Sequence, residues 1–296
     1  MKWQGRRESS NVEDARSEAT GGSGRGGGGL GGGGLGLLMT IGRAFGFKGI
    51  LVAVVVGGIL WKLGVDPSLL LGGGGAGTPQ AVVSSEDQAR FNFVKVVLAD
   101  TEDVWTAEFA RLGRTYELPT MKVYRGQVAT ACGNGNAAMG PFYCPGDRKV
   151  YIDLGFYDEL AQTFNSPGDF AQAYVIAHEV GHHVQKLLGT SDKVSQMRDR
   201  PDYNEASVRL ELQADFYAGV WANHSRKYLE HGDIEGAMRA ANAIGDDAIQ
   251  KKAQGRVVPH SFTHGTSEQR MRWFKKGLNS GRIEDGDTFS MPYRDL

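Results

Sequence analysis

Two histidines and a glutamate in an apolar stretch are the most informative residues of this 296-residue chain. His178, Glu179 and His182 form the pattern HExxH within AYVIAHEVGHHVQKLLG. Residues four positions apart share one face of a helix, so both imidazoles can reach one point. This spacing predicts a zinc site with two histidine ligands, beside which Glu179 is the general base for a water on the metal. A buried polar cluster without metal is the alternative interpretation, because such side chains are costly to bury without partners.

A catalytic zinc normally has three protein ligands, and the stretch RLELQAD offers the third. Glu211 and Asp215 lie one turn apart on one face of a second expected helix. The sequence therefore predicts Glu211 as the third ligand and Asp215 as the carboxylate that orients a ligand histidine. Glu205 is an alternative ligand, although no acidic residue follows it one turn later. His183 points away from His182 on the helix, so we expect it to have a surface or core role.

A second histidine-bearing stretch, PHSFTHGTSEQR, contains another candidate catalytic residue. His264 precedes an expected helix, and Arg270 lies one turn inside that helix. Either side chain could donate a hydrogen bond to the oxyanion that develops on an attacked carbonyl, an interaction worth about 3–4 kcal/mol in comparable sites. His264 could equally cap the helix or brace Glu211. We predict His264 as a catalytic residue, and its role relative to that of Arg270 stays open.

Helices and a small sheet must position these side chains. The expected helices cover 84–113 (as two helices), 169–189, 205–228 and 267–278. Capping boxes are expected at Ser85 with Gln88 and at Thr266 with Gln269. Short runs of β-branched and aromatic residues predict strands within 120–153. The chain is therefore predicted to have an α+β fold, with one small sheet early and long helices after it.

Two unusual segments precede the expected domain. Residues 21–36 are mostly glycine, which is typical of a flexible linker. Within 47–65, a run of thirteen uncharged residues lies between Lys48 and Lys62. This run is shorter than the roughly 20 residues of a spanning helix, but lysines that reach the lipid headgroups extend it. We predict a retained single-pass transmembrane helix at 45–65, in preference to a buried core helix or a cleaved signal peptide.

Basic residues before the apolar run set the predicted topology. These residues are Lys2, Arg6, Arg7, Arg16, Arg25, Arg43 and Lys48. Their positive charge favours a cytoplasmic N-terminus and places the bulk of the chain on the periplasmic or extracytoplasmic side. The predicted organisation is a flexible glycine-rich cytoplasmic N-terminus (1–44), a transmembrane helix (45–65), a linker (66–83) and a catalytic domain (84–296).

Charge and cysteine content narrow the partners and the compartment. The formal net charge is −1, with nearly equal numbers of acidic and basic residues, so we expect no nucleic-acid partner. Cys132 and Cys144 bracket the turn-rich stretch GNGNAAMGPFY. In an oxidising compartment the pair would close a disulfide worth about 2–3 kcal/mol. Two unrelated reduced thiols are the alternative, and the disulfide prediction depends on the predicted topology.

Several blocks of the sequence, in order, resemble one known family. They are MKWQGRRESSNVEDAR, YCPGDRKVYIDLGFYDEL, AHEVGHHVQ, RLELQADFYAGVW and FTHGTSEQRMRWF. They are similar to blocks of the bacterial predicted neutral zinc metallopeptidases, which are membrane-anchored proteins of the gluzincin type. The glycine-rich tract followed by a single apolar segment matches the layout of that family, so the resemblance runs almost end to end.

This resemblance implies a zincin-like metallopeptidase domain with one zinc ion per chain. It implies His178 and His182 as ligands and Glu179 as the general base. It also matches Glu211 and Asp215 to an ExxAD block and His264 to an HGxSEQR block. Residues 149–153 (KVYID) would lie near the active site as an edge strand that pairs with an extended peptide.

The sequence therefore predicts a zinc-dependent endopeptidase that hydrolyses peptide bonds in a peptide or protein substrate. The resemblance and the predicted anchor place it in the bacterial inner membrane, with its catalytic domain on the periplasmic side. A catalytically silent, zinc-bound binding or scaffold protein of the cell envelope is the alternative from another class. An amidase that acts on non-peptide substrates is a third interpretation.

Overall fold

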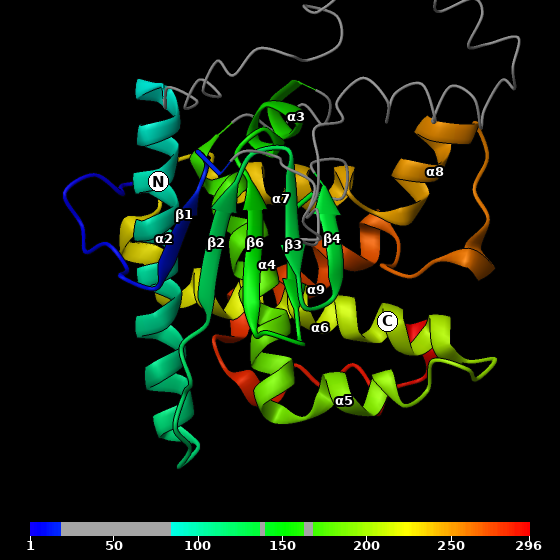
Figure 1. The fold of residues 1–296 in the computed structure, drawn as a ribbon. Coiled ribbons are helices and arrows are strands. Elements are labelled where there is room, and N and C mark those ends of the chain that lie inside the picture. The colour runs from blue at the N-terminus through cyan, green and yellow to red at the C-terminus, as the bar shows by residue number, and fades with distance from the viewer. Residues whose placement is uncertain (19–83, 137–139, 163–167) are drawn as a thin grey trace, which may run out of the picture. The chain divides into compact units, whose positions relative to one another are not determined.

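A mixed β-sheet and a group of long helices make up the described part of the chain (Figure 1). The structure is a computed structural model that describes residues 1–18, 84–136, 140–162 and 168–296. In these residues the sheet has the order β1-β2-β6-β5, and its strands are Val12–Ala15, Thr120–Tyr124, Lys149–Asp153 and Phe142–Cys144. The first three strands are parallel, and β5 is antiparallel to β6. Strands β3 (Gln127–Thr130) and β4 (Gly133–Asn136) form a separate antiparallel hairpin.

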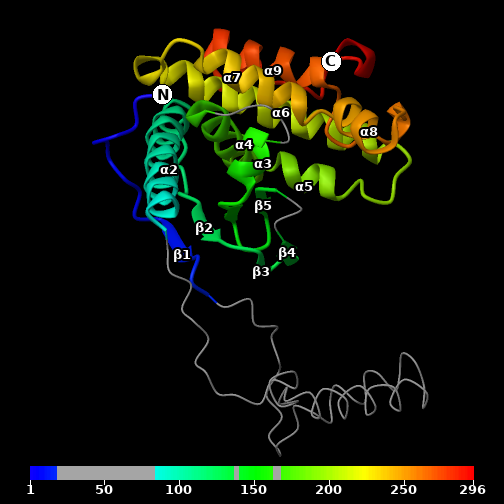
Figure 2. The same ribbon diagram turned by 90° about the horizontal axis from the view of Figure 1, so that it is seen from above.

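The helices lie in layers on one side of the sheet (Figure 2). Their bounds are α2 (Ser85–Arg111), α3 (Phe156–Gln162), α4 (Asp169–Leu188), α5 (Thr190–Ser195), α6 (Tyr203–His224), α7 (Asp233–Ala243), α8 (Asp246–Gln254) and α9 (Ser267–Ser280). Helix α4 contacts strands β5 and β6 as well as α2, α6 and α7. The α+β prediction is confirmed, and α4 is the central element that brings sheet and helices together.

Helix α4 carries HExxH, and its sequence explains its central place. Most of its side chains are buried, which is typical of a helix that is apolar on all faces. The helix ends where Gly189 adopts a left-handed conformation with φ 81°, as its position predicted. Asp169 is the first residue of the helix, and its carboxylate accepts a hydrogen bond from the Trp3 indole at 2.9 Å.

Helix α2 differs from its prediction in two ways. It is one helix of 27 residues, not two, and its cap is the Ser84 side chain, which accepts from the Asp87 backbone N–H. The middle of the helix contains the acidic residues Asp100 and Glu102. Both carboxylates are buried and bound by other side chains, so the helix continues through them. In α9, by contrast, the predicted capping box of Thr266 and Gln269 is confirmed.

Residues 1–18 depart from the expectation of a flexible N-terminus. They contribute β1, which pairs in parallel with β2 from Val12 opposite Met121 to Ala15 opposite Tyr124. Trp3 packs edge-on against Phe93 of α2, with ring centroids 5.6 Å apart. These residues belong to the same compact unit as 83–296. The four-residue strand is too short for its alternation of side chains to stand out beside a glycine-rich tract.

The predicted disulfide is confirmed, whereas the predicted membrane helix lies outside the described residues. Cys132 and Cys144 are bonded, with Cα atoms 5.8 Å apart. The sequence placed a transmembrane helix at 45–65, between two glycine-rich segments, and this part of the chain falls within 19–83. Among the helices that the structure does describe, none combines the length and the apolar character that a membrane crossing requires.

Candidate metal centre

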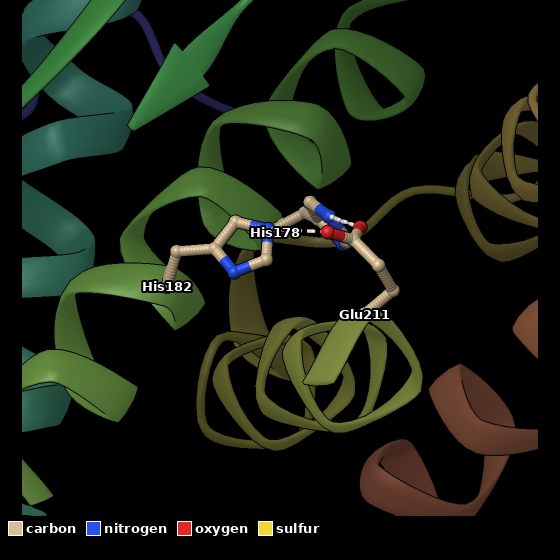
Figure 3. Close-up of side chains that lie close together, drawn as sticks. All are labelled: His178, His182 and Glu211. Carbon is tan, nitrogen blue, oxygen red and sulfur yellow. Dashed lines mark hydrogen bonds and ion pairs between the residues drawn. The ribbon is translucent and has the colours of Figure 1, made fainter. Parts of the chain in front are cut away.

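Three side chains from two helices converge on one point (Figure 3). His178 and His182 extend from α4, and Glu211 extends from α6 toward both imidazoles. His178 Nε2 lies 3.2 Å from Glu211 Oε2, and His182 Nε2 lies 3.4 Å from Glu211 Oε1. Two atoms that each bind zinc at about 2.1 Å in tetrahedral geometry are roughly 3.4 Å apart. The nitrogen and oxygen donors present, and their spacing, therefore fit a zinc ion.

A glycine allows the two ligand-bearing helices to approach. A Cβ atom on Gly181, between the two ligand histidines, would lie 3.0 Å from the Ala214 carbonyl oxygen and 3.2 Å from Ala214 Cα. Both atoms belong to the backbone of α6, which cannot turn aside as a side chain can. The glycine of HEVGH therefore sets the distance between α4 and α6, and with it the position of Glu211.

Asp215 fixes the orientation of His178. Its Oδ1 lies 2.8 Å from His178 Nδ1 and accepts a hydrogen bond from the Tyr174 hydroxyl at 2.5 Å. Arg270 donates to the same carboxylate from Nε at 2.8 Å and from Nη2 at 3.0 Å. Burial alone would raise the pKa of Asp215, but Arg270 and His178 outweigh it and the pKa lies below its ordinary value. The ionised carboxylate holds a proton on His178 Nδ1 and leaves Nε2 facing Glu211.

Gln185 has the same function for His182. Its Oε1 lies 2.9 Å from His182 Nδ1, while its amide donates to the Leu210 carbonyl at 2.6 Å and to Gln213 Oε1 at 3.1 Å. Gln185 is fully buried. Sequence reasoning missed it, although a glutamine three positions after a ligand histidine on an apolar helix was a usable signal.

The two site carboxylates have different environments. Burial would raise the pKa of Glu211, but His182 and His178 outweigh it and hold the pKa well below its ordinary value. For Glu179, burial prevails over both histidines and raises the pKa. Glu179 lines the cleft, and within the described part of the chain its carboxylate has no hydrogen-bond donor. Glu211 is thus suited to bind a cation, and Glu179 is suited to take up a proton.

His264 and Arg270, whose roles the sequence left open, have different environments in the structure. Arg270 is 3% exposed and is engaged by Asp215 and by the Ile244 carbonyl oxygen, to which Nη1 donates at 3.1 Å. His264 lines the same cleft with a half-exposed side chain. Arg270 therefore holds the Asp215 carboxylate in place. The half-exposed His264 is the one of the two that is better placed to contact a substrate.

Asp246, which the sequence did not single out, positions His264. Its Oδ2 accepts from the backbone N–H groups of Thr263 and His264 at 2.7 Å and of Gly265 at 3.1 Å. Its Oδ1 lies 3.2 Å from His264 Nδ1, and this hydrogen bond raises the pKa of His264. Asp246 begins α8, where an acidic residue is ordinary, so the sequence carried no signal of this role.

The other two candidates lie outside the group of ligands. Glu205 is exposed in the first turn of α6 and is not part of the cluster. His183 is fully buried, as one of its two expected roles requires. Its Nε2 lies 2.7 Å from the Glu117 carbonyl and its Nδ1 lies 3.0 Å from the Tyr143 hydroxyl, so it connects α4 to strand β5.

The expected edge strand is also corrected. Residues 149–153 form β6, which is paired on one side with β2 and on the other with β5, so its backbone groups are already engaged. Strand β5 is the edge instead, and Phe142 and Tyr143 of this strand line the cleft. The cleft has a volume of about 910 Å³ and runs past the metal ligands, Glu179 and His264.

Comparisons with known proteins identify the family of the chain. The sequence profile of a family described as "Putative neutral zinc metallopeptidase" matches residues 1–289. The uncharacterized protein YpfJ of Escherichia coli K12 is 49% identical over 297 residues, covering 98% of this chain and 99% of that protein. The uncharacterized protein Rv2575 of Mycobacterium tuberculosis H37Rv is 39% identical over 248 residues, covering 77% of this chain and 84% of that protein. No solved structure matches the chain.

Proposed function

Because the chain belongs to the neutral zinc metallopeptidase family, we propose that it is a zinc-dependent endopeptidase with one metal ion per chain. The observation that carries this proposal is the convergence of His178, His182 and Glu211 beside a buried Glu179. Three ligands and an adjacent base are typical of a catalytic zinc site, whereas a structural site normally has a fourth protein ligand. A bound zinc ion would lower the pKa of a coordinated water to about 7 and polarise the substrate carbonyl.

Glu179 moves the proton in this proposal. Its carboxylate lines the cleft next to the ligand helix and, among the described residues, is not committed to another donor. It takes the proton of the attacking water and later delivers it to the nitrogen of the leaving amine. The raised pKa that burial gives Glu179 supports the second half of this task, because the protonated form must be accessible.

His264 stabilises the charge that develops on the attacked carbonyl oxygen. Asp246 occupies Nδ1 of His264, so Nε2 is the atom left to donate a hydrogen bond into the cleft. A donor fixed in this way is oriented before the substrate arrives, which is the condition for strong oxyanion stabilisation. Among the described residues β5 is an outer strand of the sheet, where an extended peptide could pair with it, and we propose a peptide or protein as the substrate.

The disulfide indicates in which compartment the domain functions. Disulfides form and persist outside the reducing cytosol, and Cys132 and Cys144 are bonded. We therefore propose that the catalytic domain functions on the extracytoplasmic side of the bacterial inner membrane.

The test is to measure bound zinc and casein cleavage for the full-length protein and its Glu179→Gln variant. We expect about one zinc ion per chain in both proteins and cleavage by the parent alone, because the substitution removes the base and keeps the ligands. Chelation should abolish the cleavage, and added zinc should restore it. If both proteins bind zinc and neither cleaves any of several unfolded substrates, the alternative of a silent zinc-bound binding protein is favoured. If neither binds zinc, the metal site itself is refuted.

A further inference from the structure

The cleft continues past the metal ligands along the first turns of α6. Tyr203, Ser207 and Glu211 are spaced four residues apart, which places their side chains on one face of this helix. All three line the cleft, so this face of α6 forms one of its walls. From Tyr203 to Glu211 the helix rises about 12 Å. A bound chain that follows this wall away from the metal therefore passes Ser207 before it reaches Tyr203.

Helix α5 and the turns after it form the end of the cleft next to Tyr203. Helix α5 begins directly after Gly189, where α4 ends, and it contacts both α4 and α6 (Figure 1). In the turns between α5 and α6, the Arg198 N–H donates to the Ser195 carbonyl oxygen at 3.3 Å. The Tyr203 N–H donates to the Arg200 carbonyl oxygen at 3.1 Å. These hydrogen bonds fix the backbone of Arg198 between α5 and the first turn of α6.

Arg198 supplies a positive charge to this end of the cleft. Its side chain is exposed and belongs to the lining. Across the described ranges of the chain, no carboxylate lies within ion-pair distance of its guanidinium, whereas Arg200, two positions later, is paired with Asp202 at 3.0 Å. The Arg198 guanidinium is therefore accessible to a carboxylate of a bound molecule, with which it can form two parallel hydrogen bonds.

Two other cationic side chains that line the cleft differ from Arg198 in place or in environment. Arg270 is buried and bound to the Asp215 carboxylate. Lys252 belongs to α8, which is a different wall of the cleft from α5 and α6. A negatively charged group that lies along α6 beyond Ser207 therefore meets Arg198.

The length of the wall gives the position of this group in a bound peptide. An extended chain advances about 3.3–3.6 Å per residue. The rise of about 12 Å from Glu211 to Tyr203 thus corresponds to about three or four residues of bound peptide. In the proposed function the metal ligands mark the place of the cleaved bond, so the distance is counted from that bond.

We propose that Arg198 is a specificity-determining residue that binds a carboxylate of the substrate about three or four residues from the cleaved bond. This carboxylate belongs to an aspartate or glutamate side chain or to the C-terminus of the peptide. The inference rests on the proposed function and deepens it, because it assigns peptides with a negative charge at one defined position as the substrate class.

The preference is tested with the full-length protein and fluorescent peptides of one neutral sequence, in which a single glutamate is moved one position at a time across the cleaved bond. We expect kcat/KM to be at least fivefold higher with glutamate at the third or fourth position on one side. Arg198→Gln should lose this preference, and Arg200→Gln, the matched control, should keep it. The preference should weaken as ionic strength rises, because the Arg198 side chain is exposed.

Charge reversal distinguishes a contact with the substrate from a structural role. Arg198→Glu should prefer lysine to glutamate at the same position, whereas a purely structural role would lower the cleavage of all peptides alike. A glutamate preference that persists in Arg198→Gln, or that is lost in Lys252→Gln instead, would overturn the proposal.

Two further peptides identify the source of the carboxylate. Both end at the preferred position without an acidic side chain, one with a free C-terminus and one amidated. Cleavage of the free acid at least fivefold faster than the amide assigns the C-terminal carboxylate to Arg198. Equal cleavage of the two, together with the glutamate preference, assigns a side chain.

Binding to a protein without the proposed base separates this inference from the proposed function. Fluorescence anisotropy gives the Kd of the same peptides for Glu179→Gln, alone and combined with Arg198→Gln or Arg200→Gln. We expect Arg198→Gln to raise the Kd of the acidic peptide at least fivefold, with no change from Arg200→Gln. If this holds but the parent cleaves nothing, the peptidase function fails and the Arg198 site stands. If casein is cleaved but neither kcat/KM nor Kd depends on Arg198, the function stands and this inference is refuted.

Discussion

At the scale of single residues, the proposed zinc ligands His178 and His182 are held in fixed orientations by neighbouring side chains. Asp215 and Gln185 each hold the Nδ1 atom of one ligand histidine, so both Nε2 atoms face Glu211 before any metal arrives. Such orientation lowers the entropic cost of metal binding and sets the basicity of the ligands. We therefore expect the metal content to depend on Glu211 and not on other acidic residues near the site.

Glu211→Gln and Glu205→Gln make this a matched comparison on one helix. Both substitutions replace a carboxylate of α6 by an amide of the same shape, but only Glu211 contacts the histidines. We expect Glu211→Gln to bind zinc at least 100-fold more weakly and to lose activity, with Glu205→Gln close to the parent in both. Zinc titration against a competing chelator measures the affinities. Equal affinities for the two variants would remove Glu211 from the ligand set.

His264 predicts a pH dependence with a definite sign. Because Nδ1 faces the Asp246 carboxylate and holds a proton, Nε2 carries a hydrogen only in the imidazolium form. The pKa of His264 lies above its ordinary value because of this hydrogen bond, so we expect oxyanion stabilisation to be present below the raised pKa and to fade as pH rises through it.

Two variants separate this effect from other titrations. Asp246→Asn should shift the alkaline limb of kcat to lower pH, because the hydrogen bond that raises the pKa of His264 is weakened. His264→Gln should abolish that limb and reduce kcat by about 100-fold at neutral pH, with zinc content unchanged. Profiles of kcat from pH 5 to 10 provide the measurement. An alkaline limb that is identical in all three proteins would assign the limb to another group.

The residues that sequence alone could identify were those with internal spacing. HExxH and ExxAD each place two side chains on one helical face, so the spacing alone predicts that these side chains lie close together. Tyr174 and Asp246 bind residues from other segments of the chain, Asp215 and His264. Gln185 binds His182, three positions before it, a spacing that belongs to no recognised motif. The roles of Asp246 and Tyr174 depend on tertiary contacts that the sequence did not indicate, whereas the position of Gln185, three residues after His182, was a usable signal.

At the scale of elements, the crossing of α4 and α6 determines the site. Gly181 packs against the backbone of Ala214, so this contact helps to position the helix that carries the histidines against the helix that carries Glu211. Helices α4 and α9 were predicted well because each has strong apolar character or a capping box and a glycine stop. Helix α8 was missed because it buries only Asp246, which leaves little periodicity to detect.

Gly181→Ala tests the crossing, with Gly236→Ala of α7 as its control. The added methyl group at 181 would meet the backbone of Ala214 at 3.0 Å, whereas at 236 its nearest neighbour is Arg239 Nη2 at 3.7 Å. We expect Gly181→Ala to destabilise the fold by about 1–3 kcal/mol and to weaken zinc binding. Gly236→Ala should be neutral or stabilising by up to about 1 kcal/mol, since alanine favours a helix. Urea unfolding with and without zinc measures both, and equal stability of the two variants would show that α6 can shift freely.

At the scale of the whole molecule, the first residues of the chain complete a domain whose proposed catalytic groups come from 178–264. The sequence predicted the helices α4, α6 and α9 and the strands within 120–153, since these depend on local patterns. It did not predict the docking of residues 1–18, because the partners of Arg6 and Arg7 lie more than ninety residues later on α2. A truncated protein that begins after the glycine-rich tract would lack β1 and the donors to Glu102, so the full chain is the proper object of study.

The parallel pairing of β1 with β2 also fixes an order of events during synthesis. Val12 is made early, but its partner Met121 follows 109 positions later in the chain. At about 5–20 residues per second, the N-terminal segment waits roughly 5–20 s on the ribosome before its place in the sheet exists. The apolar run emerges within that interval, while neither side of the domain can yet fold. Addition of β1 to the edge of the sheet, beside β2, is therefore a late step of folding.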